Sequence, residues 1–309
     1  MTGNEYRYGN SSLIYHLINV CTYVLYRFLK LFSGTKTNSG KANPLLITGL
    51  FRSGTTITSR IVQDMGFSAG PDDHLLKAIG SRKELNPDGF LENHFCMELS
   101  MYLFYKTDSW GDAPPAKLRV EGLELREEDD NEMVWFSLTK IHDDRISNVN
   151  KLKTQLQGSA SHPENYFNRN FSNNSFVKNP HIAVLFPYFK KLFPQSKVLV
   201  VFRNAFDAVN SAKRVSPLVN YDVYNAYYEE LISEYKTGNK NILFFSYDNL
   251  ILNPENSQNK LSITLNQKPE TQKPSNVRKK ELPGLLILGE VPKETIEIYN
   301  FMLENCINK

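Results

Sequence analysis

The sequence predicts an α/β protein in which a central parallel sheet is flanked by helices to give three layers. Short apolar runs lie at residues 44–48, 197–202 and 241–247, and a segment of helical character follows the first two. Continuous apolar runs of this length are typical of strands buried on both faces of a parallel sheet. Because strands and helices alternate along the chain, we expect a doubly wound sheet with ligands outside the carboxyl ends of its strands.

The composition narrows the classes of protein that the chain can belong to. Its 309 residues include 41% hydrophobic and 22% charged residues, with a formal net charge of +3. These values argue against a disordered or multi-span membrane protein and against a nucleic-acid partner, while a local basic pocket for an anion stays compatible with them. Cys21, Cys96 and Cys306 have no paired spacing, so we expect no disulfide framework, no metal and a reducing, cytoplasmic compartment.

Residues 11–33 predict an amphipathic helix. Leu17, Val24 and Phe28 share one side of the helical period, whereas polar residues such as Asn19 lie nearer the other side. The polar residues interrupt the run too often for a helix that spans a membrane. The helix has two interpretations at this point: it docks on the protein's own body or a sister subunit, or it lies on a membrane surface.

The rest of the chain predicts one large domain. Residues 34–43 are polar and rich in Gly and Ser, so we expect an N-terminal helix and linker over 1–43 and a domain over 44–309. Residues 90–105 favour a helix. The acidic run at 121–132 is typical of a solvated face or loop.

The stretch GLFRSGTT, Gly49–Thr56, has the frame of a phosphate-binding loop between a strand and a helix. In such a P-loop-like turn the backbone N–H groups and the helix N-terminus converge on an anion. The lysine that a nucleotide kinase needs is replaced by Thr55, and the cation is Arg52 inside the loop. A sulfuryl group carries less negative charge than a phosphoryl group, so an arginine and backbone donors can suffice for it without magnesium.

A second anion-binding element follows the strand at 197–202. In RNAFDAVNSAKR, Arg203 stands at the end of the strand and Ser211 about two turns along the next helix. Both side chains can reach one phosphate, because they lie on the same side of a strand-to-helix turn. The two elements together predict a ligand with two separate anionic groups.

On these two motifs the chain resembles the sulfotransferases that use 3'-phosphoadenosine-5'-phosphosulfate (PAPS). The resemblance implies that the loop binds the 5'-phosphosulfate and that Arg203 and Ser211 bind the 3'-phosphate. VKNP at 177–180 resembles a K-D-P segment of the membrane-associated and bacterial branches, which makes Lys178 the expected cation near the sulfuryl group. NPDGFLEN (86–93) and SYDNLILNPE (246–255) resemble further family segments. The donor-binding set that the resemblance implies is Arg52, Ser53, Gly54, Thr55, Thr56, Arg203, Ser211 and Tyr247.

The general base is the open question of the expected mechanism. Relatives that modify glycans use a glutamate that follows the loop, and this chain has Asp73 in the corresponding region. We expect Asp73 as the base, with Lys178 and Arg52 as its catalytic partners. The alternatives are Asp72, Glu92 and His181, and capping of a helix at HLLKAI is a purely structural role for the two aspartates.

The expected activity is transfer of a sulfuryl group from PAPS to a hydroxyl of a carbohydrate or lipid acceptor by in-line displacement. The abundant aromatic residues and the N-terminal helix favour such an acceptor. Partners at the N-terminal helix would be a membrane surface or a second copy of the chain. A nucleotide-binding module that has lost catalysis remains an alternative, and a P-loop kinase is disfavoured by the missing lysine.

Overall fold

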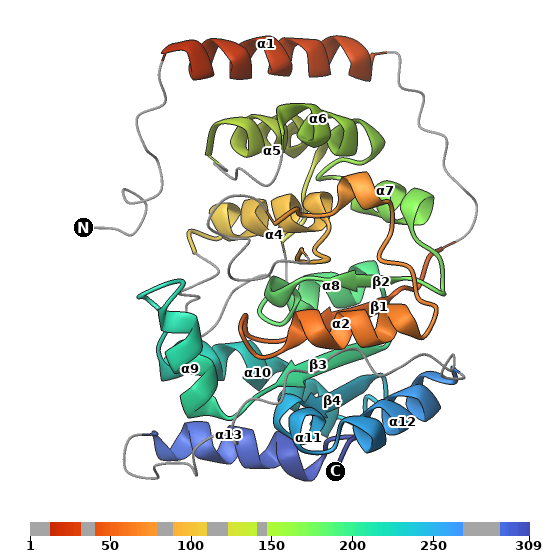
Figure 1. Cartoon of the computed structure of the whole chain (residues 1–309). Helices are drawn as coiled ribbons and strands as arrows, with labels where there is room; N and C mark the ends of the chain where they lie inside the picture. The colour runs from red at the N-terminus through yellow and green to blue at the C-terminus, as the bar shows by residue number, and fades with distance from the viewer. Residues whose placement is uncertain (1–12, 32–40, 79–88, 110–122, 141–146, 268–290) are drawn as a thin grey trace.

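The computed structural model describes residues 13–31, 41–78, 89–109, 123–140, 147–267 and 291–309. The expected flap at 266–280 and the linker at 34–43 therefore lie mostly outside the described residues. Four parallel strands form the central sheet in the order β2-β1-β3-β4 (Figure 1). The strands are β1 (Leu45–Thr48), β2 (Phe176–Lys178), β3 (Val198–Phe202) and β4 (Ile242–Ser246). The predicted α/β class and the three apolar strands are confirmed.

Helices cover both faces of the sheet, because each strand is buried on both sides. Leu46 and Val200 point into the larger core with α4, α8, α9, α10 and α13, whereas Ile47 and Val201 point into a second core with α2, α11 and α12. This alternation is the period of two expected of a strand. The helices are α1 (Leu13–Lys30), α2 (Thr55–Asp64), α4 (His94–Lys106), α5 (Glu127–Lys140), α6 (Asn148–Gln157), α7 (Pro163–Asn170), α8 (Phe186–Leu192), α9 (Ala205–Lys213), α10 (Tyr221–Lys236), α11 (Tyr247–Leu252), α12 (Pro254–Leu265) and α13 (Lys293–Glu304).

The register of the sheet places the functional ends of the strands at one edge. Ile47 pairs with Lys178 and Thr48 with Val200, so β1 and β2 end within one residue of each other and β3 runs two residues further. Each of these ends turns directly into a loop or helix, and the loop after β1 leads into α2. Ligands of open α/β sheets bind outside these carboxyl ends.

Helices α1, α5 and α6 stack above α4 at the β2 side of the sheet (Figure 1). The predicted N-terminal helix is present as α1. The side that it turns to the body is not the expected one. Its polar side contacts the body: Tyr26 is 1% exposed, Asn19 is 5% exposed, and Tyr23 packs against Trp135 of α5. Helix α1 therefore docks on the protein's own body, as one interpretation expected, but through its tyrosines and Asn19, and the apolar stripe faces outward. None of the described helices is both long and apolar enough to cross a membrane.

Two local expectations change in the structure. The acidic run continues as the first turns of α5, where Glu127 and Glu128 lie at the positive end of the helix dipole. The segment around the two aspartates forms a 3-10 helix, η1 (Asp72–His74), and Leu75 is extended and bridges to Asn93. A capped α-helix that starts at His74 is therefore wrong for the described part of that segment.

Candidate active site

The loop Gly49–Thr56 joins β1 to α2 and has a left-handed backbone at three positions. The φ angles are 134° at Gly49, 71° at Arg52 and 92° at Gly54. Such turns direct successive N–H groups toward a common point and form an anion-binding concavity. A positive φ at a residue with a long side chain, as at Arg52, is a strained conformation that occurs mainly at functional sites. The loop thus keeps the backbone of a phosphate cradle.

Tyr228 of α10 fixes this loop from below. Its buried hydroxyl accepts a hydrogen bond from the Leu50 N–H (3.1 Å) and lies 3.3 Å from the Ser53 hydroxyl and 3.2 Å from the Val201 carbonyl. The hydroxyl therefore ties the loop to β3. No sequence signal distinguished Tyr228 from the other tyrosines of α10.

Gly54, like Gly49, is a loop position at which any side chain would collide with a neighbour. A Cβ atom there would lie 2.1 Å from the Tyr247 ring, whereas a Cβ at Gly66, which has almost the same φ, would meet nothing within 4 Å. We expect Gly54→Ala to lower the free energy of unfolding clearly more than Gly66→Ala, which loses only about 1–2 kcal/mol from backbone strain. Urea unfolding of both variants measures the difference. Equal losses would show that Tyr247 does not restrain the loop.

Three arginines converge at the mouth of the loop. The Arg52 Nε–H donates a long hydrogen bond (3.5 Å) to the Ser211 hydroxyl, which joins the loop to α9. Desolvation and then the nearby guanidinium groups of Arg214 and Arg203 lower the pKa of Arg52. The buried Nε of Arg203 has no hydrogen-bond partner among the described residues. A cluster of like charges with an unsatisfied buried donor fits an anionic ligand, which would neutralise the first and satisfy the second.

The turn from β3 into α9 holds Arg203 in this cluster. Asn204 caps α9 through its side chain, and its own N–H donates to Asp248 (2.7 Å). The Arg203 guanidinium lies 5.5 Å from the centre of the Tyr247 ring and 3.5 Å from the Asp207 carboxylate. Asp248 thus positions the turn. Sequence reasoning named Tyr247 but not Asp248 or Arg214, although they fall in the two quoted segments SYDNL and RNAFDAVNSAKR.

Lys178 brings a buried ammonium group to the other side of the loop. It ends β2, is 2% exposed, and donates to the Thr56 hydroxyl (3.2 Å) and the Phe90 carbonyl (3.1 Å). It also pairs with the Glu92 carboxylate at 2.5 Å. Because Thr56 lies in the first turn of α2, a lysine and a glutamate meet directly beside the anion-binding loop. The expected catalytic cation therefore has a carboxylate partner, and it comes from Glu92.

Asp73 lies in a different environment from the loop residues. Its carboxylate is half exposed and pairs with Lys153 of α6, and this hydrogen bond lowers the pKa of Asp73. Asp72 shares the same 3-10 helix, and the His181 ring packs edge-on against Phe104 of α4 (centroids 5.2 Å apart). Among the four candidate bases, Glu92 is the one whose described contacts place it beside Lys178 and the loop.

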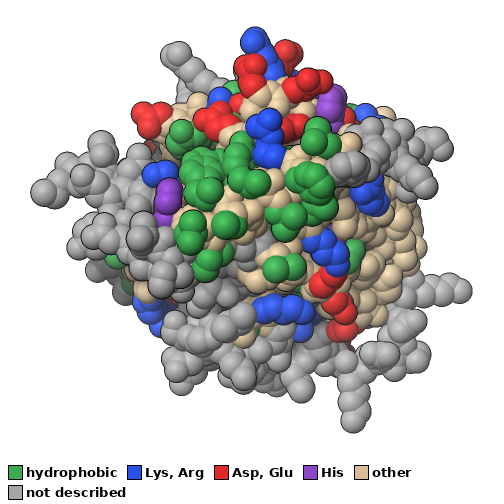
Figure 2. All heavy atoms as spheres, turned by 90° about the horizontal axis from the view of Figure 1, so that it is seen from above, with side chains coloured by type: hydrophobic (Ala, Val, Ile, Leu, Met, Phe, Trp, Pro, Cys, Tyr) green, Lys and Arg blue, Asp and Glu red, His purple; other side chains and the backbone are tan. Residues whose placement is uncertain are grey.

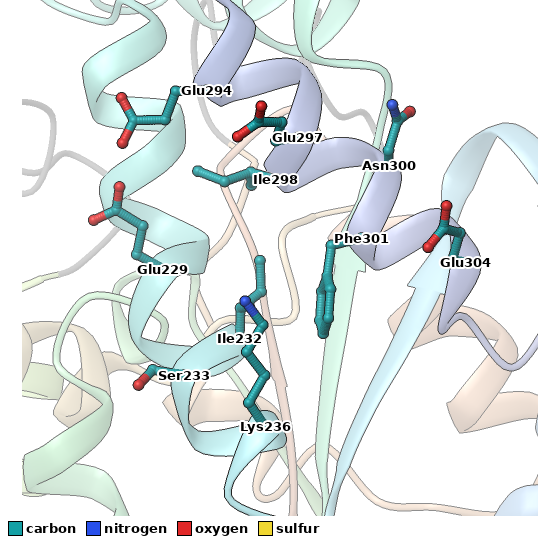
Figure 3. A pocket seen from close by; sticks show the side chains of 10 residues that line it. All are labelled: Glu229, Ile232, Ser233, Lys236, Glu294, Glu297, Ile298, Asn300, Phe301 and Glu304. Atoms are coloured by element: carbon teal, nitrogen blue, oxygen red, sulfur yellow. The ribbon is translucent and has the colours of Figure 1, made fainter.

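A surface hollow of about 600 Å³ lies elsewhere, between α10 and α13, and Glu229, Glu294, Glu297 and Glu304 are among its lining residues (Figure 3). Its carboxylates are unsuited to the anion that the arginine cluster fits. Over the described ranges, no group of three or more His, Cys, Asp and Glu side chains is arranged to hold a metal ion.

Fold and site together define an α/β protein whose loop, arginine cluster and buried lysine lie at the ends of parallel strands, an arrangement that suits an anionic ligand. The sequence pattern of the Sulfotransferase family matches residues 44–266. The match covers most of the chain, so this chain belongs to the sulfotransferase family and is a transferase.

Solved sulfotransferase structures are similar to the chain at low identity. The sulfotransferase domain of the Synechococcus PCC 7002 olefin synthase is 15% identical, with a TM-score of 0.43 over 87% of this chain and 98% of that one. Sulfotransferase STF9 from Mycobacterium avium is 14% identical, with a TM-score of 0.38 over 93% and 72% of the two chains. Sulfotransferase STF1 from Mycobacterium tuberculosis is also 14% identical, with a TM-score of 0.37 over 84% and 75%. The search of curated proteins gave no match.

Proposed function

We propose that the chain transfers the sulfuryl group of PAPS to a hydroxyl of a carbohydrate or lipid acceptor. The observation that carries the proposal is the contact between Arg52 of the loop and Ser211 of α9, with Arg203 and Arg214 beside them. The loop and the start of α9 would then bind two anionic groups of one ligand. PAPS has two such groups, the phosphosulfate and the 3'-phosphate. The family match supports the transfer of a sulfuryl group.

The binding roles follow from the position of each group. The loop N–H groups, Thr55 and Arg52 would hold the phosphosulfate at the start of α2, where the helix dipole favours an anion. Arg203, Ser211 and Arg214 would hold the 3'-phosphate. Tyr247, which packs on Gly54 and under Arg203, keeps the two subsites at a fixed separation.

The catalytic roles divide between Lys178 and Glu92. Transfer forms a bond from the acceptor oxygen to sulfur and breaks the bond from sulfur to the bridging phosphate oxygen. Lys178 would donate a hydrogen bond to that bridging oxygen as it gains charge. The Glu92 carboxylate, 2.5 Å from the ammonium, would accept the acceptor's proton. Asp73 stays a prediction for the base, but its contact is with Lys153 of α6, whereas Glu92 lies beside Lys178 and the loop, and this position supports Glu92.

The test combines binding and transfer. Calorimetry with adenosine 3',5'-bisphosphate measures the donor site, and radiolabelled PAPS with a panel of sugars, glycolipids and phenols measures transfer. We expect binding, and label on a sugar or lipid hydroxyl. Binding with no label on any acceptor would instead favour a nucleotide-binding module without catalysis, and label on phenols alone would contradict the acceptor class.

Arg203→Ala should weaken binding of the bisphosphate by about 10- to 100-fold, because a charge-assisted contact to phosphate contributes roughly 1.5–3 kcal/mol. Lys293→Ala is the matched control, since the Lys293 side chain is 92% exposed on α13. Calorimetry on both variants measures the effect. Unchanged affinity in the Arg203 variant would refute the assignment of the 3'-phosphate site.

A further inference from the structure

The outward side of α1 is an apolar surface, which we call the α1 face. Its members are large hydrophobic side chains that are all more than two fifths exposed: Leu17 (62%), Ile18 (44%), Val24 (60%), Leu25 (47%), Phe28 (57%) and Leu31 (81%). Figure 2 shows apolar side chains gathered in the middle of this side of the molecule, with acidic side chains at the upper edge. A contiguous exposed patch of this kind marks an interaction surface.

The orientation of α1 is the reverse of that of an ordinary surface helix. A surface helix normally turns its apolar stripe to the core and its polar side to water. Here Asn19, Tyr23 and Tyr26 pack toward α5 and α6, and the leucines and valine point away. The fold therefore leaves the apolar side of α1 exposed and packs the opposite side against α5 and α6.

The charges of α1 indicate what covers the α1 face. The helix has no acidic residue, and Arg27 in its last turn is exposed, whereas Lys30 lines a hollow with Glu127 and Asp130 of α5. A second copy of α1 would bring another arginine to Arg27 and no carboxylate from that helix. Anionic lipid headgroups can pair with Arg27, while their acyl chains accept the apolar side chains.

We propose that the chain binds the surface of a bilayer that contains anionic lipid, through the α1 face. The helix is 18 residues long, about 27 Å at 1.5 Å per residue, so it can lie along the interface over its whole length. This surface is separate from the donor-binding residues and does not depend on the proposed acceptor. It would hold the transferase at the membrane without a spanning segment.

Flotation with vesicles tests the proposal. The full-length protein is mixed with vesicles of phosphatidylcholine, with or without about one quarter phosphatidylglycerol, and the bound fraction is measured. We expect binding that is several-fold stronger with phosphatidylglycerol and weaker in high salt. Val24→Asp/Leu25→Asp should lower the bound fraction at least about tenfold. Ile263→Asp, on α12 at a side chain that is 74% exposed, should bind as the unmodified protein does.

A single-site probe gives a second readout. Cys21 is exposed on α1, whereas Cys96 and Cys306 are buried, so a polarity-sensitive dye can be attached to Cys21 alone. Its emission should shift to the blue on addition of the anionic vesicles. Circular dichroism of each variant checks that it is folded.

Three results would overturn the proposal. They are no flotation with either vesicle, equal flotation of the Val24→Asp/Leu25→Asp variant, and dimerisation through this face. The last would appear in analytical ultracentrifugation as a dimer that the double variant abolishes, and the occupant would then be a second copy of the chain.

Discussion

Replacing Glu92 by glutamine should lower kcat by about 100- to 10,000-fold, the range that a positioned general base contributes. The donor affinity should change little, because Glu92 contacts Lys178 and not the arginine cluster. Glutamine keeps the size of the side chain and can still accept a hydrogen bond from Lys178, so the fold should persist. Steady-state kinetics with saturating PAPS and the best acceptor of the panel measures kcat.

Asp73→Asn is the matched comparison for this variant. It removes a carboxylate of the same charge from a half-exposed position that pairs with Lys153. We expect its kcat to stay within about twofold of the unmodified protein, as is usual for an exposed pair that contributes little. The opposite pattern, a loss in Asp73→Asn and none in Glu92→Gln, would return the role of base to Asp73.

Lys178→Ala should reduce kcat by about 100-fold or more, because it would remove the donor that we propose for the charge on the bridging oxygen. The dissociation constant of the bisphosphate product should change much less, since that ligand lacks the sulfuryl group. Rapid single-turnover measurements separate the chemical step from product release. A large loss of donor affinity with unchanged kcat would assign Lys178 to binding instead.

A second buried lysine provides the control for lost stability. Lys151 of α6 is 3% exposed and donates to the Ser137 carbonyl, away from the loop. Lys151→Ala should lower the free energy of unfolding, as loss of a buried hydrogen-bonded group does, while kcat is retained. If both variants lost kcat in proportion to their stability, the effect of Lys178 would be structural.

The sequence predicted those features that depend on local pattern. The strands β1, β3 and β4 are continuous apolar runs, and the loop glycines mark the strand-to-helix turn. β2 has only three residues, too few for a periodic signal, and it was found as a strand only in the structure. The positions of Arg52 and Ser211 follow from two turns at adjacent strand ends, so their meeting was predictable from the fold class.

Other features depend on packing between distant segments. Glu92 and Lys178 are 86 residues apart, and their pairing requires the segment before α4 to run beside β2. The orientation of α1 depends on α5 and α6, which bury its tyrosines and leave its leucines exposed. No period within a single helix can decide which of its two sides the rest of the protein covers.

The arginine cluster has a thermodynamic consequence for the protein as a whole. Without an anion, the positive charges of Arg203 and Arg214 repel that of Arg52, and this repulsion opposes the compact state. Any polyanion that fits between them removes that opposition and adds its binding free energy to the folding free energy. Under the proposed function, the nucleotide product with its two phosphate groups would satisfy this condition as well as the donor. The stability of the fold and the occupancy of the site would then rise together.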